Sequence, residues 1–465
     1  MAEQGRKGIM LLLAVIAVTA LMDGLDGSIV NVALPTLAGD FGTDTGTVAW
    51  ITVTYLLMLA GLLMLFARIA KNGAVKKVIS VGIGLFTISS LFCGISTNFE
   101  MLIIFRAAQG IGAAMMGAAV PMLCVKYLPS NMMGLGMGIL TLGCSIGFAI
   151  GPAIGGIIVD VLSWHWIFLI NLPVGIIVLA LTLKVVPKDE PYKKGGLDVS
   201  GAILLFAAAA AGVLALERAP YPESLTMVTV AAVVSIICLA AFVLVELRKS
   251  DPLLDVRVFK HWKFDFVFLA FMLGNLAYMG LLYLMPFYMD VVMGWGSSAS
   301  GTYLFIPPLI TLILCIPISR WSDRTGRRWF CVTACVALVA GSSIMSLFAR
   351  EAAVIPLLAT LICMGLMWAF CGGPMASRIV ENTAGESREI GSSLMNESIY
   401  LGGTIGTALF AMIFTAGTGA GGVNFTDLQP DVFLDGFIIS MVAVVVISAI
   451  TAVLSYTVKD PKVIS

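Results

Sequence analysis

The sequence predicts an all-α integral membrane protein with fourteen transmembrane helices, arranged as two six-helix bundles with two extra central helices. Three observations support this fold class. The chain contains fourteen apolar stretches of roughly 20 residues, the length that a helix needs to cross a bilayer core. Hydrophobic residues make up 59% of the 465 residues and charged residues only 12%, about half the charged share of soluble domains. The Lys and Arg residues, finally, gather on alternate sides of these stretches.

The basic residues define the two sides of the predicted membrane. All but three of the 27 Lys and Arg residues lie in the two tails and in every second connection between stretches. The exceptions are Arg218 and Arg350 on the other side, and Arg106 inside a stretch. Because basic connections remain in the cytoplasm, we expect both tails to be cytoplasmic and the number of spans to be even.

The predicted spans follow one another with short connections. In chain order they are 9–34, 47–69, 75–97, 101–125, 133–160, 165–185, 199–217, 225–246, 264–289, 299–319, 329–349, 353–377, 389–416 and 433–457. The longest cytoplasmic connections, 186–198 and 247–263, isolate the seventh and eighth spans as a pair. We therefore expect an N-terminal bundle over 1–190, the extra helices and their linkers over 191–258, and a C-terminal bundle over 259–465.

The two blocks of six spans share internal features. Each carries a basic turn after its second span, at 68–77 and at 320–328. Each also has a glycine-rich fifth span, with Gly147, Gly151, Gly155 and Gly156 in the first block and Gly402, Gly403 and Gly406 in the second. A six-plus-six repeat is typical of secondary transporters, whose substrate site lies between the halves near the middle of the membrane.

Composition argues against several other classes of protein. The nine Cys residues occur singly in or beside apolar stretches, and only two His residues are present, so no metal site or disulfide framework is predicted. We expect no cofactor, no enzymatic activity and no nucleic-acid partner, since the basic residues flank spans. The first apolar run continues to Leu34 without a small-residue cleavage site, which favours an uncleaved first span.

Four ionisable side chains fall within predicted spans, where a charge is costly and therefore points to a function. They are Asp23 and Asp26 in the first span, Arg106 in the fourth and Glu397 in the thirteenth. Asp23 and Asp26 are three residues apart and share a helical face. We predict that these four residues couple transport to protons. The alternatives are a purely structural ion pair with Arg106 and, for Asp23, a position facing the extracellular vestibule.

Several sequence motifs occur together, in order, along the whole chain. The first is Leu102–Ala114, which contains Arg106, Gln109 and Gly110, and the second is Gly147–Gly156, which contains Pro152. The others are Leu25–Pro35, which contains Asp26 and Asn31, and the segments Trp50–Tyr55 and Trp164–Gly175. This set resembles the major facilitator superfamily, and in particular its fourteen-helix drug:proton antiporter branch.

One motif departs from the family pattern. The loop after the second span should contain an Asp-Arg pair, but Ala70 occupies the position of the Asp. The second copy is closer to the pattern, with Asp323, Arg324 and Arg327. In the family this loop latches the cytoplasmic gate, so the resemblance implies a weak latch in the first half.

The resemblance implies a proton-coupled multidrug efflux antiporter that exports lipophilic, cationic organic compounds by alternating access. Its partners would be a small amphiphilic substrate, protons and the lipid bilayer, and we expect a monomer in the inner (cytoplasmic) membrane. Two alternatives are an exporter of an endogenous amphiphile, such as a lipid, siderophore or metabolite, and a transport-deficient membrane sensor.

The predicted site combines cavity and gating residues. Predicted substrate-binding residues are Asn31, Tyr55, Met115, Asn275, Tyr278, Tyr283, Asn396 and Tyr400. Predicted gating residues are Gly147, Gly151, Pro152, Gly155 and Gly156, together with Asp323, Arg324 and Arg327. The glycine face permits close helix packing and Pro152 favours a bend. We predict a rocking contact between the halves there, with plain helix packing as the alternative, and a peripheral position for helices 7 and 8.

Overall fold

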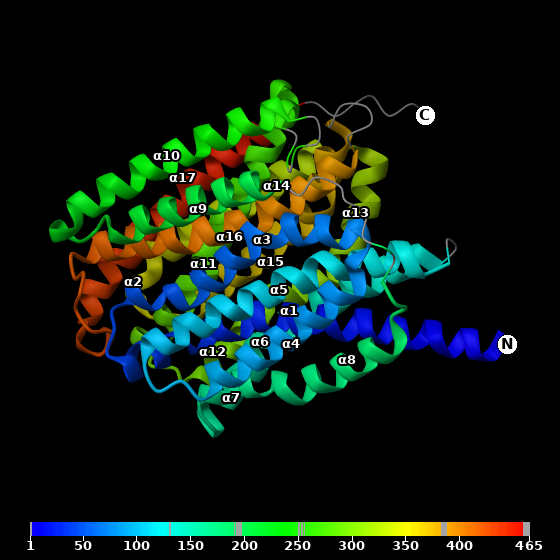
Figure 1. Cartoon of the computed structure of the whole chain (residues 1–465). Coiled ribbons are helices and arrows are strands. Elements are labelled where there is room, and N and C mark those ends of the chain that lie inside the picture. The colour runs from blue at the N-terminus through cyan, green and yellow to red at the C-terminus, as the bar shows by residue number, and fades with distance from the viewer. Residues whose placement is uncertain are drawn as a thin grey trace.

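The computed structural model is a bundle of α-helices joined by short connections (Figure 1). It describes residues 2–129, 132–189, 191, 198–249, 252, 254, 256–382 and 388–458. Over these ranges the chain contains no β-strand.

The helices follow the predicted blocks in chain order. The first block contains α1 (Ala2–Phe41), α2 (Thr45–Val48), α3 (Trp50–Ile69), α4 (Val75–Gly94), α5 (Phe99–Tyr127), α6 (Met133–Val161), α7 (His165–Leu169) and α8 (Asn171–Val185). The central pair is α9 (Val199–Arg218) and α10 (Leu225–Arg248). The second block contains α11 (Trp262–Val291), α12 (Ser297–Leu304), α13 (Ile306–Thr325), α14 (Arg328–Phe348), α15 (Val354–Asn382), α16 (Arg388–Thr418) and α17 (Pro430–Thr457).

Thirteen helical segments in the described ranges are long and apolar enough to cross a membrane. One of them, Thr45–Gly94, has 50 residues and contains both α3 and α4. These helices have 20 residues each and meet in a π-helical turn, Ala70–Ala74, where Gly73 has φ +118°. Only glycine adopts such a φ readily. The all-helical membrane fold is confirmed, whereas the total of fourteen spans and the bundle boundaries remain predictions.

Three predicted spans are broken where the sequence analysis placed continuous helices. The span predicted at 47–69 begins at the end of α2 and continues in α3. The span predicted at 165–185 is divided into α7 and α8, and the span predicted at 299–319 into α12 and α13. The break between α12 and α13 precedes Pro307 and Pro308, which occupy the first turn of α13. Proline lacks the backbone N–H that would continue the preceding helix, so the break follows from the sequence.

The two blocks are built around equivalent helix pairs, α1 with α6 and α11 with α16. In the first pair, a Cβ on Gly147 would lie 2.3 Å from the carbonyl oxygen of Leu21. In the second, a Cβ on Gly406 would lie 2.4 Å from the carbonyl oxygen of Leu276. Glycine on the fifth helix of each block thus lets two backbones touch, which supports the internal repeat.

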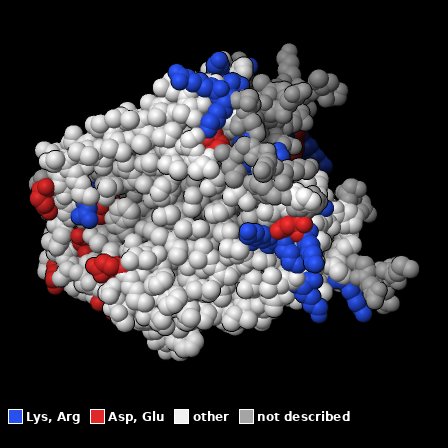
Figure 2. All heavy atoms as spheres, viewed as in Figure 1, with Lys and Arg blue, Asp and Glu red and all other residues white. Residues whose placement is uncertain are grey.

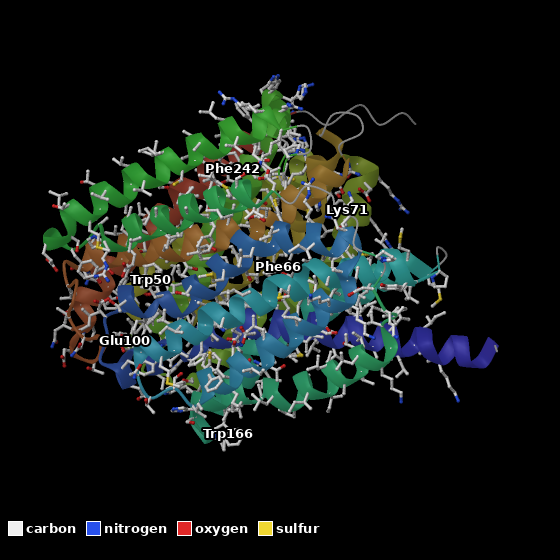
Figure 3. The ribbon with its side chains drawn as sticks, viewed as in Figure 1. Trp50, Phe66, Lys71, Glu100, Trp166 and Phe242 are labelled. Atoms are coloured by element: carbon white, nitrogen blue, oxygen red, sulfur yellow. The ribbon has the colours of Figure 1, made fainter. Side chains whose placement is uncertain are left out.

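The central pair lies along one side of the molecule (Figure 1). Helix α9 packs against α3 of the first block and α16 of the second, and α10 packs against α9. Many side chains of α10 are exposed and apolar, including Val230, Ile236 and Leu244, as expected for a surface that faces lipid. Figure 3 shows side chains of this helix pointing away from the bundle.

Charged side chains separate between the two ends of the bundle. On the face drawn in Figure 2, Lys and Arg gather toward the end where α1 begins and α17 ends, and Asp and Glu mark the opposite end. We call these the basic end and the acidic end. The basic end includes the turn Ala70–Ala74, and the acidic end includes Asp44, Asp160 and Asp431.

Candidate functional site

The two blocks are hydrogen-bonded to each other at the acidic end. Tyr283 of α11 donates to the carbonyl oxygen of Thr45, and the backbone N–H of Phe425 donates to that of Thr43 at 3.1 Å. Asp160, in the last turn of α6 at this end, accepts hydrogen bonds from the backbone N–H groups of Ser297 and Ser298 at 3.1 and 2.7 Å. These contacts join the blocks across their interface, so this end is closed.

A cavity of about 400 Å³ lies between the blocks. Its walls come from α1, α3, α5 and α6 of the first block and from α11 and α16 of the second. Pro121 and Leu140, on the halves of α5 and α6 nearest the basic end, belong to the lining. Neither α9 nor α10 contributes a residue to the lining. The cavity therefore extends from the middle of the bundle toward the basic end.

Asp23 provides the charge of this cavity. Among the described residues that line it, Asp23 is the single Asp, Glu, Lys or Arg. The hydroxyl group of Tyr55, on α3, donates to the Asp23 carboxylate at 3.4 Å. Asn31 and Tyr400 supply further polar groups from α1 and α16. The remaining surface is dominated by apolar side chains, which suits an amphiphilic ligand with a positive charge.

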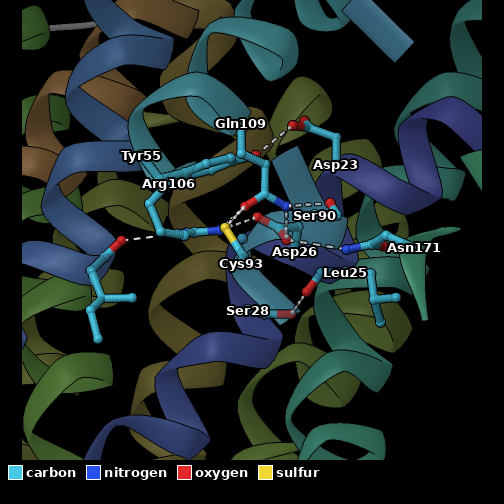
Figure 4. Close-up of polar contacts among 12 residues, drawn as sticks. Asp23, Leu25, Asp26, Ser28, Tyr55, Ser90, Cys93, Arg106, Gln109 and Asn171 are labelled. Carbon is cyan, nitrogen blue, oxygen red and sulfur yellow. Dashed lines mark hydrogen bonds and ion pairs between the residues drawn. The ribbon is translucent and has the colours of Figure 1, made fainter. Parts of the chain in front are cut away.

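Asp26 lies outside the cavity, in a polar network inside the first block (Figure 4). Its carboxylate pairs with the Arg106 guanidinium at 2.8 Å. It also accepts hydrogen bonds from the amides of Gln109 at 2.9 Å and Asn171 at 3.4 Å. Asp26 and Arg106 are each only 1% exposed. A buried ion pair is tolerated when further hydrogen bonds satisfy its remaining polar atoms, which these amides do.

Arg106 is held in place by contacts to α1, to α3 and within its own helix, α5. Its Nε donates to the carbonyl oxygen of Ile51 at 3.0 Å, and its Nη1 also donates to Gln109 at 2.7 Å. The guanidinium carbon lies 4.2 Å from the ring centre of Tyr55, within the range of a cation–π contact. Tyr55 thus touches the cavity carboxylate Asp23 with its hydroxyl group and the buried ion pair with its ring.

Glu397 lies in the second block, on α16, and is 2% exposed. Neither of its carboxylate oxygens has a hydrogen-bond partner among the described residues. It is not part of the cavity lining. An unpaired carboxylate in an apolar interior is costly, and the neutral, protonated form avoids most of that cost.

The structure brings together some of the predicted substrate-binding residues and separates others. Asn31, Tyr55 and Tyr400 line the cavity. Four others do not line the cavity. Met115 lies against Gly82 of α4, and Asn275 donates to the carbonyl oxygen of Phe271. Tyr278 packs edge-on against Trp368, and Tyr283 donates to Thr45 at the acidic end. The side chain of Asn396 falls outside the described part of the chain.

The helix-5 glycines divide between two contacts. A Cβ on Gly147, Gly151 or Gly155 would approach α1 within the same block at 2.0–2.6 Å. A Cβ on Gly156 would lie 2.1 Å from the carbonyl oxygen of Ser297 in the second block. Pro152 meets the same block, since its carbonyl oxygen faces Gly301. The motif therefore combines close packing inside one block with a contact between the blocks.

At the basic end, Asp323 of the second gating loop pairs with an Arg of the same loop. Asp323 accepts hydrogen bonds from Arg327, four residues later, at 2.7 and 3.0 Å, and Arg324 is exposed. In the first loop, Ala70 is completely buried in the turn between α3 and α4.

Sequence reasoning missed the polar residues of the acidic end, Asp44 and Asp160. Both lie in or beside short connections, and their hydrogen bonds run to residues more than 100 positions away. A helix-capping position was the available signal for Asp44 alone, which precedes α2 and accepts from Thr47 N–H at 2.6 Å. Asn171, a third partner of Asp26, lies in the Trp164–Gly175 motif, which by itself predicts no role for this residue.

The sequence model of the Major Facilitator Superfamily matches residues 16–407. The chain belongs to this superfamily. One relative is the Multidrug resistance protein B homolog of Mycobacterium tuberculosis, which is 28% identical over 414 residues that cover 88% of this chain and 76% of the relative. Another is the Cephamycin export protein CmcT of Amycolatopsis lactamdurans, which is 28% identical over 445 residues that cover 92% of this chain and 90% of the relative. A bacterial homolog of the human lysosomal transporter Spinster, solved in an inward-facing and unoccupied conformation, has a TM-score of 0.69, 16% identity and coverage of 97% and 96%.

Membership confirms the family predicted from the motifs. As a superfamily member, the chain is a multi-pass membrane transporter of small molecules and not an enzyme. Its place in the fourteen-helix branch remains a prediction.

Proposed function

We propose that this transporter exports lipophilic, cationic organic compounds in exchange for protons, by alternating access between the two blocks. The observation that supports this most strongly is the cavity between the blocks, in which Asp23 is the single Asp, Glu, Lys or Arg among the described lining residues. Apolar walls provide affinity for a lipophilic body, and a carboxylate in a low-dielectric site attracts a positive charge strongly.

The roles of the two acids of α1 follow from their surroundings. Asp23 can meet either a cation or a proton from the cavity, and the two neutralise the same carboxylate. Competition between them produces exchange, because protonation of Asp23 removes the charge that holds the cation. Asp26, paired with Arg106 and satisfied by Gln109 and Asn171, would respond through Tyr55, which contacts both Asp23 and Arg106.

Orientation follows from the charged ends. We propose that the basic end, with both termini, faces the cytoplasm of a cell with the protein in its inner membrane, since basic connections remain cytoplasmic. The closed acidic end then faces outward, and the cavity is accessible from the side where a compound to be exported is found. We further propose that the functional unit is a monomer, since each chain contains both blocks and a complete cavity.

Efflux from whole cells tests this function. Cells that express the protein should lose a preloaded fluorescent lipophilic cation faster than cells that carry an empty vector. An uncoupler that dissipates the proton gradient should abolish the difference. Unchanged efflux in the presence of the uncoupler would exclude proton exchange.

A second candidate is the export of an endogenous amphiphile. The relative named as a cephamycin exporter is aligned over nearly its full length, and its name refers to a natural product. The test compares the small molecules excreted by expressing cells with those excreted by a deletion strain. This candidate predicts a specific compound that is absent from the medium of the deletion strain.

A further inference from the structure

The connection between α9 and α10 is inserted at the closed acidic end. Its residue Tyr221 is only 8% exposed, although it lies in a loop. The Tyr221 hydroxyl group lies 3.0 and 3.1 Å from the two carboxylate oxygens of Asp44. Asp44 itself follows α1 and caps α2 in the first block. The central helix pair is thus bound to the first block by a hydrogen bond to a charged group, which is stronger than a bond between neutral groups.

The same carboxylate also holds the second block. The backbone N–H of Gly422, in the connection between α16 and α17, donates to Asp44 at 3.1 Å. The Tyr221 ring packs against this connection, since a Cβ on Gly421 would lie 3.2 Å from it. A Cβ on Gly46 of α2 would likewise lie 3.1 Å from the Tyr221 hydroxyl group. Three segments that are distant in sequence therefore meet at one buried point.

The Tyr221 hydroxyl group is suited to act as a lasting hydrogen-bond donor to Asp44. Burial, and then the nearby charge of Asp44, raise the pKa of Tyr221 above its ordinary value. The hydroxyl group consequently keeps its proton over the physiological range and continues to donate to Asp44.

We propose that Tyr221 is a gating residue, through which the α9–α10 hairpin holds the acidic end closed. Opening of that end must separate α2 of the first block from the α16–α17 connection of the second, and this separation breaks the contacts that meet at Asp44. The proposal gives a role in the cycle to a helix pair that lies outside the cavity. It rests on alternating access between the blocks but not on the identity of the transported compound.

Distances between spin labels test the proposal directly. One label pair replaces Leu162 and Leu347, exposed residues near the acidic end of each block. A second pair replaces Val125 and Trp329, exposed residues near the basic end, and both pairs are placed in a background without native cysteines. Tyr221→Phe keeps the ring and removes the hydroxyl group. The ratio of molecules open to molecules closed at the acidic end should rise about tenfold, the effect of losing a hydrogen bond to a charged group, while the distance at the basic end shortens.

Two comparisons make the result specific. Tyr456→Phe, the same chemical change near the basic end of α17, should leave both distance distributions unchanged. In an Asp44→Asn background, Tyr221→Phe should change the ratio less than about threefold, because the charged acceptor is already absent. Unchanged distances in Tyr221→Phe, or equal effects of this substitution with and without Asp44, would overturn the proposal. Because no substrate is present, the outcome is independent of whether the exported compound is a cation.

Discussion

At the scale of single residues, the two carboxylates of α1 differ more than their spacing suggests. Asp23 lines the cavity and accepts from Tyr55, whereas Asp26 is buried against Arg106. A separation of three residues places both on one helical face. It does not reveal that α5 covers one of them and leaves the other open. The sequence therefore predicted the importance of both residues but not how their roles are divided.

The ion pair of Asp26 leads to a prediction about stability. Asp26→Asn leaves the Arg106 guanidinium buried without a counter-charge, which costs about 3–5 kcal/mol when one partner of a buried pair is removed. Thermal unfolding of the purified protein in detergent should show a clear loss. The double substitution Asp26→Asn with Arg106→Gln should recover part of it. A single variant as stable as the wild type would show that the pair does not support the fold.

Glu397 leads to a different expectation. Because it lies outside the cavity lining and its oxygens have no partner among the described residues, it should not contact substrate in this state. Glu397→Gln should therefore reduce proton-driven transport of cationic and neutral compounds by the same factor. Selective loss of cation transport, measured with matched compounds of similar size, would contradict this placement.

At the scale of helices, the close contact of α1 and α6 depends on glycine. A Cβ on Gly147 would lie 2.3 Å from a backbone oxygen, whereas a Cβ on Gly138, in the same helix, meets nothing within 4 Å. Gly147→Ala should then lower thermal stability by about 1–3 kcal/mol, as overpacking does. Gly138→Ala serves as the matched control and should have a neutral or slightly stabilising effect. Equal stability changes in the two variants would mean that the close packing at Gly147 does not govern the stability of this helix.

Sequence patterns predicted where the helices lie better than which side chains pack against one another. Apolar length and the alternation of basic connections located the spans, because the bilayer imposes both. The placement of Tyr278 and Tyr283 could not be obtained in this way. Both are polar residues on a helix of the second block that faces the first, yet one packs on Trp368 and the other binds Thr45. Which neighbour a side chain meets depends on helix rotation and tilt, which periodicity does not record.

At the scale of the whole molecule, one end of the bundle is closed by hydrogen bonds between the blocks and the cavity extends toward the other. The closing contacts lie in short connections, such as Asp44 with Gly422, or at helix ends, such as Asp160 with Ser298. The six-plus-six repeat predicted two blocks with a site between them, and the cavity lies there. The choice of conformation was beyond prediction, because the same sequence must support both open states with similar free energy.

The central claim is that the proton gradient drives export of a cation bound by Asp23. Its most direct test uses the purified protein in lipid vesicles, with an imposed pH gradient and a fluorescent lipophilic cation outside. Wild-type protein should accumulate the cation against its concentration gradient and release it when an uncoupler is added. At an effective dielectric constant of about 20, a charge contact at about 4 Å is worth about 4 kcal/mol at most. Asp23→Asn should accordingly weaken apparent cation affinity at least about tenfold while leaving thermal stability unchanged. Accumulation that survives the uncoupler, or an Asp23→Asn variant with wild-type affinity, would contradict the account.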